Sequence, residues 1–241
     1  GGVSRAIWAA SPDLVINAAA YTAVDQAEAE PERAFRINAD AAGEAAAAAR
    51  EVGAKIIQIS TDYVFPGTGD RAWRPDDSVA PLGVYGASKL AGEEQVRAAN
   101  PDHLIVRTAW VFSPFSRNFV RTMLRLAGQG SEVRVVADQR GCPTGALDLA
   151  EGLLNATRTW ASGSSAGVGR TMHLAGQKPC SWADFAEAIF EASRAAGGPE
   201  AIVIPIATED FPTPARRPAN SVLDSGVFHA TFGTAALDWR S

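Results

Sequence analysis

Short, β-branched apolar runs alternate with helical patterns along the first part of this chain, and this alternation constrains the fold most. The runs are continuous rather than alternating, which is typical of strands buried on both faces of a parallel sheet. The order therefore predicts an α/β fold, a doubly wound, Rossmann-like parallel sheet with right-handed crossovers. The expected strands are residues 14–20, 54–60, 103–109 and 133–137, and the helices between them are residues 31–52, 84–99 and 118–127.

Beyond about residue 140 the alternation of strand and helix patterns becomes less regular. Helical patterns at 147–160 and 182–196 alternate with short strands at 172–175 and 202–206, and a proline-rich segment follows at 211–221. We expect residues 1–140 to form a partial dinucleotide-binding domain that carries the catalytic residues. Residues 141–241 are expected to form mainly a smaller substrate-binding lobe, with some segments returning to the main domain.

Composition excludes several classes of function. A net charge of -5 offers no basic field for nucleic acid, and no apolar run is long enough to span a membrane. The two cysteines have no CxxC spacing, and no Asp/Glu/His cluster suggests a metal ligand set. A soluble, cytoplasmic protein without a metal is expected, and a homodimer is compatible with the sequence.

The sharpest local motif is Tyr85-Gly-Ala-Ser-Lys89, at the beginning of an expected helix. A spacing of four residues puts both side chains on one helix face. With three tyrosines and three lysines among 241 residues, the pattern is expected by chance about 0.04 times. An isolated YxxxK is still more often a solvated surface pair, so its neighbours decide the interpretation.

Polar residues follow the expected strands at the edge where an open parallel sheet binds ligands. Each has an ordinary alternative, since Thr61 and Asp62 could cap a turn and Trp110 could fill a core. Together with Tyr85 and Lys89 they supply a hydroxyl donor, a phenol and a cation. They are Asn17, Tyr21 and Thr22 after the first strand, Ser60, Thr61, Asp62 and Tyr63 after the second, and Trp110 after the third.

These three groups suit the reduction of a ketone. Hydride addition leaves negative charge on the ketone oxygen, which must be stabilised and protonated in the transition state. A free phenol has a pKa of about 10. We expect the Lys89 ammonium to lower the pKa of Tyr85 toward the operating range.

Six segments resemble the dTDP-4-dehydrorhamnose reductase family almost from end to end: INAAAYTAVDQAE, ISTDYVFPGTGD, VYGASKLAGEE, RTAWVF, NFVRTMLRLA and PTPARRPANSVLD. The resemblance implies an extended short-chain dehydrogenase/reductase that reduces the C4 ketone of dTDP-4-dehydro-6-deoxy-L-hexose to dTDP-L-rhamnose. It implies NADPH as the cofactor, with NADH as the alternative, and a dTDP-sugar as the substrate. By that resemblance Tyr85 is the catalytic acid, Thr61 helps to polarise the C4 carbonyl, and Lys89 binds the nicotinamide ribose.

The resemblance assigns further binding positions. Ala20, Tyr21 and Thr22 match a stretch that contacts the cofactor, as Tyr85 and Lys89 also do. Asp62 and Trp110 match positions that contact the substrate, together with Thr61. The segment that resembles the sugar-nucleotide lobe contains Arg216, Arg217 and Asn220.

Two other functions share the fold. The 4,6-dehydratases carry Thr-Asp-Glu where this chain has Thr61, Asp62 and Tyr63, so elimination is disfavoured. The 4-epimerases share the Ser/Thr, Tyr and Lys but resemble the rest less well. A regulatory subunit of methionine adenosyltransferase keeps the fold without needing Thr61, Tyr85 and Lys89, and their presence argues against that function.

The chain departs from the family at its beginning. A dinucleotide-binding fold is expected to open with a strand, a glycine-rich turn and a helix, and no glycine pair here occupies such a turn. Gly1 is therefore expected to lie before the family's fourth strand, with on the order of 40 residues preceding it. We expect this chain alone to bind NADPH weakly and to show little reductase activity.

Overall fold

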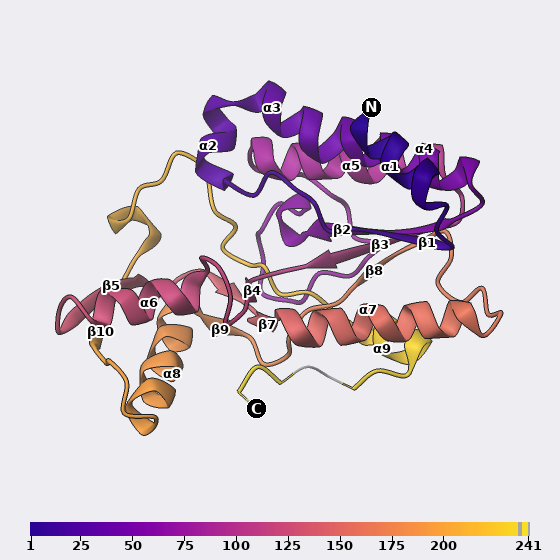
Figure 1. Cartoon of the computed structure of the whole chain (residues 1–241). Coiled ribbons are helices and arrows are strands. Elements are labelled where there is room, and N and C mark those ends of the chain that lie inside the picture. The colour runs from indigo at the N-terminus through magenta and orange to yellow at the C-terminus, as the bar shows by residue number, and fades with distance from the viewer. Residues whose placement is uncertain (236–237, 241) are drawn as a thin grey trace.

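The main sheet has four parallel strands in the order β1-β2-β3-β8, in a computed structural model that describes residues 1–235 and 238–240 (Figure 1). Continuous apolar runs predicted these strands because both faces of the sheet are covered. Ile56 and Ile57 are both fully buried, although they point to opposite faces. The strands are β1 (Leu14–Asn17), β2 (Lys55–Thr61), β3 (His103–Thr108) and β8 (Arg170–His173).

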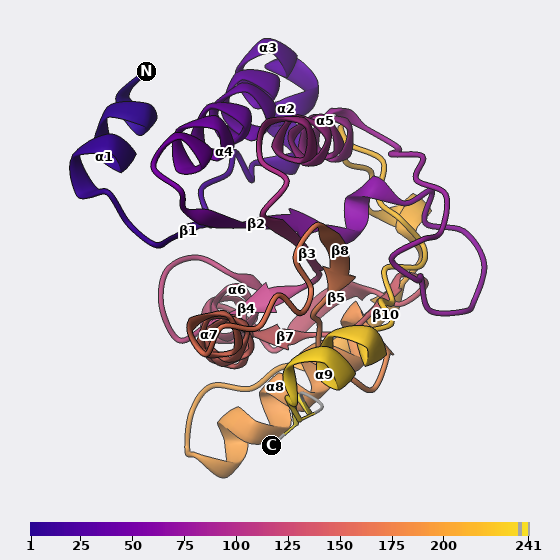
Figure 2. The ribbon, with the colours of Figure 1, turned by 90° about the vertical axis from the view of Figure 1, so that its right-hand side faces the viewer.

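Helices cover both faces of this sheet, which confirms the doubly wound arrangement (Figure 2). On one face lie α1 (Gly2–Ala10), α4 (Ala41–Glu51) and α5 (Val84–Ala99), packed through alanines and Val96. On the other lie α7 (Ala146–Ala161) and α9 (Gly226–Phe232), whose Trp160 and Phe228 pack on the strands. The carboxyl end of β2 continues into the short 3-10 turn η2 (Asp62–Val64).

The expected helix at 31–52 begins at Pro31 as predicted and runs to Glu51, but it is not uniformly α-helical and a further short helix precedes it. The structure has α2 (Val24–Ala29), α3 (Pro31–Phe35), a π-helical segment η1 (Arg36–Asp40) and then α4. Asn38 in η1 is 1% exposed and hydrogen-bonds to the backbone of Tyr21. A π-segment widens the helix by a residue per turn, and here it accompanies this inward-facing amide.

The expected strand at 133–137 forms, but its place in the main sheet is wrong. β5 (Glu132–Val136) pairs in parallel with β10 (Ile202–Ile206) in a separate two-stranded sheet. Its burial alternates because only one face is covered, by α6 (Phe119–Ala127) and α8 (Trp182–Ala195). Short pairs lie between the two sheets, namely β4 (Val111–Phe112) with β7 (Thr144–Gly145) and β6 (Arg140–Gly141) with β9 (Cys180–Ser181); η3 (Thr208–Asp210) follows β10.

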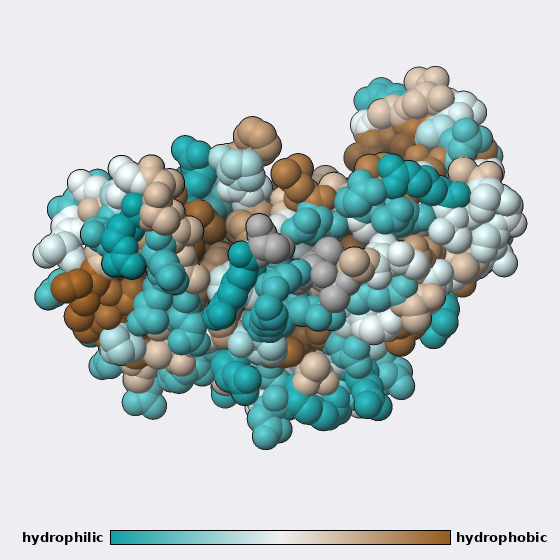
Figure 3. Space-filling view, turned by 90° about the horizontal axis from the view of Figure 1, so that it is seen from below, coloured by the Kyte–Doolittle hydropathy of each residue, from teal (hydrophilic) through white to brown (hydrophobic). Residues whose placement is uncertain are grey.

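The underside of the molecule, the face seen from below in Figure 1, is largely hydrophilic with separate hydrophobic patches (Figure 3). Within residues 1–235 and 238–240, no helix combines the length and the apolar character that a bilayer crossing requires.

Candidate active site

Helix α5 brings the YxxxK motif against the carboxyl end of β2. Two of its glycines make this approach possible, because a Cβ on Gly86 would collide with the Tyr63 carbonyl oxygen. A Cβ on Gly92 would collide with the carbonyl oxygen of Asn38 in η1. The Tyr85 ring consequently packs edge-on against the Tyr63 ring, with centroids 5.4 Å apart and planes at 78°.

Thr61 and Asp62 are buried where β2 ends. The Thr61 hydroxyl donates to Asp62 Oδ1 at 3.0 Å and accepts from the backbone amide of Tyr63 at 3.2 Å. Asp62 Oδ2 is buried and has no hydrogen-bond partner among the described residues. Burial raises the pKa of Asp62 to about 6, although hydrogen bonding with Ser221 and Thr61 opposes the shift.

The Tyr85 phenol is harder to ionise than a free phenol. Burial raises the pKa of Tyr85, the Asp62 carboxylate raises it further, and hydrogen bonding with Thr61 opposes both. The Lys89 ammonium donates to the Ile59 carbonyl oxygen at 2.7 Å, and burial lowers the pKa of Lys89 to about 8. The expectation that Lys89 brings the pKa of Tyr85 below its ordinary value is therefore wrong, because desolvation dominates.

The stretch Ala20 to Thr22 is fixed to the same helix through Asn38. The Tyr21 amide donates to Asn38 Oδ1 at 2.7 Å, and Asn38 Nδ2 donates to the Tyr21 carbonyl and to Ser88 Oγ. The Tyr21 phenol donates to Glu30, while Thr22 is exposed. The sequence argument missed Asn38, although a lone amide in an alanine-rich helical pattern is a usable signal.

A cavity of about 400 Å³ lies between the main sheet and the lobe formed by β5, β10, α6 and α8. Arg217 stands at this cavity, where it donates to Asp25 at 2.6 Å and to the Tyr63 hydroxyl at 3.2 Å. Arg134 provides a second cation. The apolar wall consists of Phe119, Met123, Leu126, Val135, Val136, Trp182 and Phe211.

Trp110 lies behind this wall. Its ring stacks on Trp182 with centroids 3.4 Å apart and planes at 8°, so Trp182 rather than Trp110 lines the cavity. Trp110 also has a φ of 49°, a left-handed conformation that is strained for a large side chain. Packing holds it there, since the indole fills the space where a Cβ on Gly141 would be.

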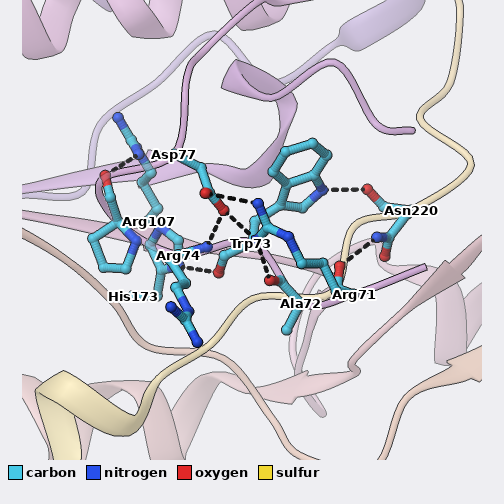
Figure 4. Close-up of polar contacts among 9 residues, drawn as sticks. Arg71, Ala72, Trp73, Arg74, Asp77, Arg107, His173 and Asn220 are labelled. Atoms are coloured by element: carbon cyan, nitrogen blue, oxygen red, sulfur yellow. Dashed lines mark hydrogen bonds and ion pairs between the residues drawn. The ribbon is translucent and has the colours of Figure 1, made fainter. Parts of the chain in front are cut away.

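The three residues expected from the proline-rich segment separate in space. Arg217 reaches the cavity and Arg216 is exposed. Asn220 is 4% exposed, and its side chain donates to the Arg71 carbonyl at 2.7 Å (Figure 4). The same side chain accepts from the Val222 amide. Its amide is thus used inside the protein, and a substrate contact by Asn220 stays a prediction.

The cavity wall is the part of the site that the sequence argument left unassigned. Phe119, Met123 and Leu126 belong to the NFVRTMLRLA segment, which was noted for its resemblance but given no role. Arg134 and Trp182 carried no such signal, because only tertiary packing brings them to the cavity. Among residues 1–235 and 238–240, no three His, Cys, Asp or Glu side chains gather as a metal site would require.

A parallel sheet covered on both faces, with a YxxxK helix seated against its carboxyl edge, defines a short-chain dehydrogenase/reductase of the extended kind. The RmlD substrate binding domain model matches residues 1–241. The chain is 45% identical over 241 residues to dTDP-4-dehydrorhamnose reductase of Escherichia coli K12, covering 99% of this chain and 80% of that protein. The Sinorhizobium fredii reductase is 44% identical over 238 residues, with coverage of 99% and 80%.

Solved structures agree with this assignment. A Clostridium acetobutylicum dTDP-4-dehydrorhamnose reductase superposes with a TM-score of 0.90 at 41% identity, covering 99% of this chain and 81% of that one. The Bacillus anthracis reductase, solved in complex with NADP, gives 0.88 at 36% identity, also over 99% and 81%. The chain belongs to the dTDP-4-dehydrorhamnose reductase family.

Proposed function

We propose that this chain reduces the C4 ketone of dTDP-4-dehydro-6-deoxy-L-hexose to the C4 hydroxyl of dTDP-L-rhamnose, with NADPH as the hydride donor. The observation that carries the proposal is the placement of Tyr85, which packs on η2 beside Thr61 with Lys89 one helical turn further along α5. A phenol and a hydroxyl then lie together at the carboxyl edge of a parallel sheet.

Tyr85 acts as the proton donor. The phenol carries its proton at neutral pH, because its pKa is not lowered from the ordinary value, and it can deliver that proton to the ketone oxygen as negative charge develops there. Thr61 supplies a second hydroxyl that stabilises the same charge. The Asp62 carboxylate lies beside Thr61 and would accept a hydrogen bond from a substrate hydroxyl.

The residues present fit the nicotinamide end of a dinucleotide. An ammonium carries three donors, and one hydrogen bond, to Ile59, is found for buried Lys89 within the described part of the chain. Its remaining N–H groups would bind the ribose hydroxyls, and the segment Ala20 to Thr22 would line the same side. The bound cofactor supplies the hydride, and the NADP complex of the Bacillus anthracis relative supports this choice.

The cavity suits the nucleotide half of the substrate. Phe119, Trp182 and Met123 offer a flat, apolar wall for a thymine ring, with Trp110 stacked behind it. Arg217 and Arg134 offer guanidinium groups for the diphosphate. Tyr63 touches both Arg217 and Tyr85, so the diphosphate position and the reacting sugar position are neighbours.

One assay separates the candidate functions. In protein that binds NADPH, we expect dTDP-4-dehydro-6-deoxy-L-hexose to be reduced to dTDP-L-rhamnose with one NADPH oxidised per sugar. An epimerase would change a sugar without net NADPH oxidation, and a regulatory subunit would do neither. Failure to oxidise NADPH at saturating substrate, by protein that binds both ligands, would contradict the proposal. The homodimer and the cytoplasmic location stay predictions.

A further inference from the structure

A buried charge cluster lies one helical turn beyond Lys89. Glu93 is fully buried, and both of its carboxylate oxygens accept hydrogen bonds. Arg107 of β3, itself 3% exposed, binds the two oxygens at 2.8 and 2.7 Å. Ser60 Oγ donates to Oε1 at 2.6 Å, and Arg97 donates to Oε2 at 2.8 Å. Every oxygen of this carboxylate is therefore satisfied by at least two donors.

The cluster fixes the register of α5 on β2. Tyr85, Lys89 and Glu93 are spaced by four residues and share one face of the helix. Lys89 donates to the carbonyl of Ile59, and Glu93 accepts from Ser60, the next residue of β2. Tyr85 interacts with the following residue, Thr61. Three successive turns of α5 thus meet three successive residues of one strand.

Arg107 extends the cluster to the loop on the far side of β3. Its Nη1 donates to the Pro75 carbonyl at 3.2 Å (Figure 4). Its guanidinium lies over the Phe65 ring. Arg71 and Asp77 close that loop with paired hydrogen bonds, and Trp73 donates to Asn220. The position of the carboxylate is therefore set by β2, β3 and the loop, not by α5 alone.

We propose that Glu93 is a positioning residue for the reduction, whose buried carboxylate anchors the turn of α5 that carries Lys89 and keeps the Lys89 ammonium charged. The proposal rests on the proposed function because that function gives Lys89 its role. The contacts of Glu93 do not depend on it. A buried ammonium without a nearby anion tends to lose its proton.

The charges around Lys89 support this role. Burial lowers the pKa of Lys89, and the Glu93 carboxylate opposes that shift. Arg107 and Arg97 face Glu93 from β3 and from the next turn of α5, and Tyr85 precedes Lys89 on its own helix. Removing the carboxylate would leave the guanidinium groups of Arg107 and Arg97 near a buried ammonium. The change is therefore expected only to lower the pKa of Lys89.

The test is a direct titration of Lys89. The chain has only Lys55, Lys89 and Lys178, so protein labelled with carbon-13 at lysine Cε gives three resonances, and Lys89→Met assigns the one of interest. In Glu93→Gln the Lys89 midpoint is expected to fall by about one pH unit. Arg97→Gln weakens the same cluster but keeps the carboxylate, and it is expected not to lower the midpoint.

A purely structural role for Glu93 would leave the Lys89 midpoint unchanged in Glu93→Gln, or lower it equally in Arg97→Gln, and either result overturns the proposal. If Glu93→Gln does not fold, Glu93→Gln with Arg107→Gln removes both buried charges together. The midpoint is still expected to fall, because the Glu93 carboxylate, one helical turn from Lys89, is the charge that raises the pKa of Lys89. If wild type and all variants lacked reductase activity while the Lys89 midpoints shifted as expected, the proposed function would be contradicted. The effect of Glu93 on the charge of Lys89 would still stand.

Discussion

Tyr85 shows how burial decides the chemistry of a side chain. Desolvation and the Asp62 carboxylate both raise the pKa of Tyr85, and together they outweigh the hydrogen bonding with Thr61. A neutral phenol is the form that a reduction requires, because the group must give a proton to the product oxygen. The same residue would need activation to act as a base in the reverse, oxidative direction.

Asp62 provides a prediction for stability at this scale. Its pKa in the folded protein, about 6, lies above the ordinary 3.8, so folding favours the protonated form and the ionised form is destabilising. The asparagine of Asp62→Asn cannot ionise. As pH rises from 4 past 6, the free energy of unfolding of this variant should therefore increase relative to that of the wild type by up to about 3 kcal/mol. Urea unfolding across this range measures the difference, and a difference independent of pH would contradict the assignment.

Arg217 and its neighbour Arg216 form a matched pair. Arg217 faces the cavity, so Arg217→Met should weaken dTDP binding about ten-fold, as expected for the loss of a charge-assisted hydrogen bond. Arg216 is exposed, and Arg216→Met should change the affinity by less than about two-fold. Titration calorimetry with dTDP compares them. Equal losses would mean that the nucleotide does not occupy this cavity.

At the scale of single elements, the glycines of α5 determine where the helix lies. Gly86→Ala would place a methyl group on the Tyr63 carbonyl, so α5 must shift, with an expected loss of about 2 kcal/mol of stability and most of the activity. Gly2→Ala in α1 meets open space and should be neutral or stabilising by up to about 1 kcal/mol. Unfolding midpoints and reductase rates of the two variants test this prediction. A Gly86→Ala variant with the stability and rate of the wild type would show that α5 can be displaced without effect.

The elements differ in how far the sequence predicted them. Residues 84–99 and 202–206 form α5 and β10 as expected from their local helical and apolar patterns, although β10 is only partly buried. Residues 133–136 form a strand, but its partner β10 lies about 70 residues further along the chain, and a hydrophobic run does not specify its partner. The π-segment at 36–40 follows from contacts of Asn38 with Tyr21 and Ser88, which are tertiary.

The whole molecule explains which parts of the site were predictable. The placement of Thr61, Tyr85 and Lys89 near one another was predictable from sequence, because a strand end and a helix beginning are local features that the sheet edge brings together. Their roles stay predictions. The cavity depends on contacts such as Arg217 with Asp25, which are 192 residues apart, and no local pattern reveals them. The resemblance gave both arginines one role, whereas the structure separates them.

The central claim is that this molecule reduces a nucleotide-sugar ketone with Tyr85 as the proton donor. The most direct test is the rate of NADPH oxidation with dTDP-4-dehydro-6-deoxy-L-hexose in wild type and Tyr85→Phe, with the dTDP dissociation constant of each as the control. We expect turnover to fall about 10²- to 10⁴-fold while dTDP affinity stays within about two-fold. Turnover near that of the wild type in Tyr85→Phe would contradict the account.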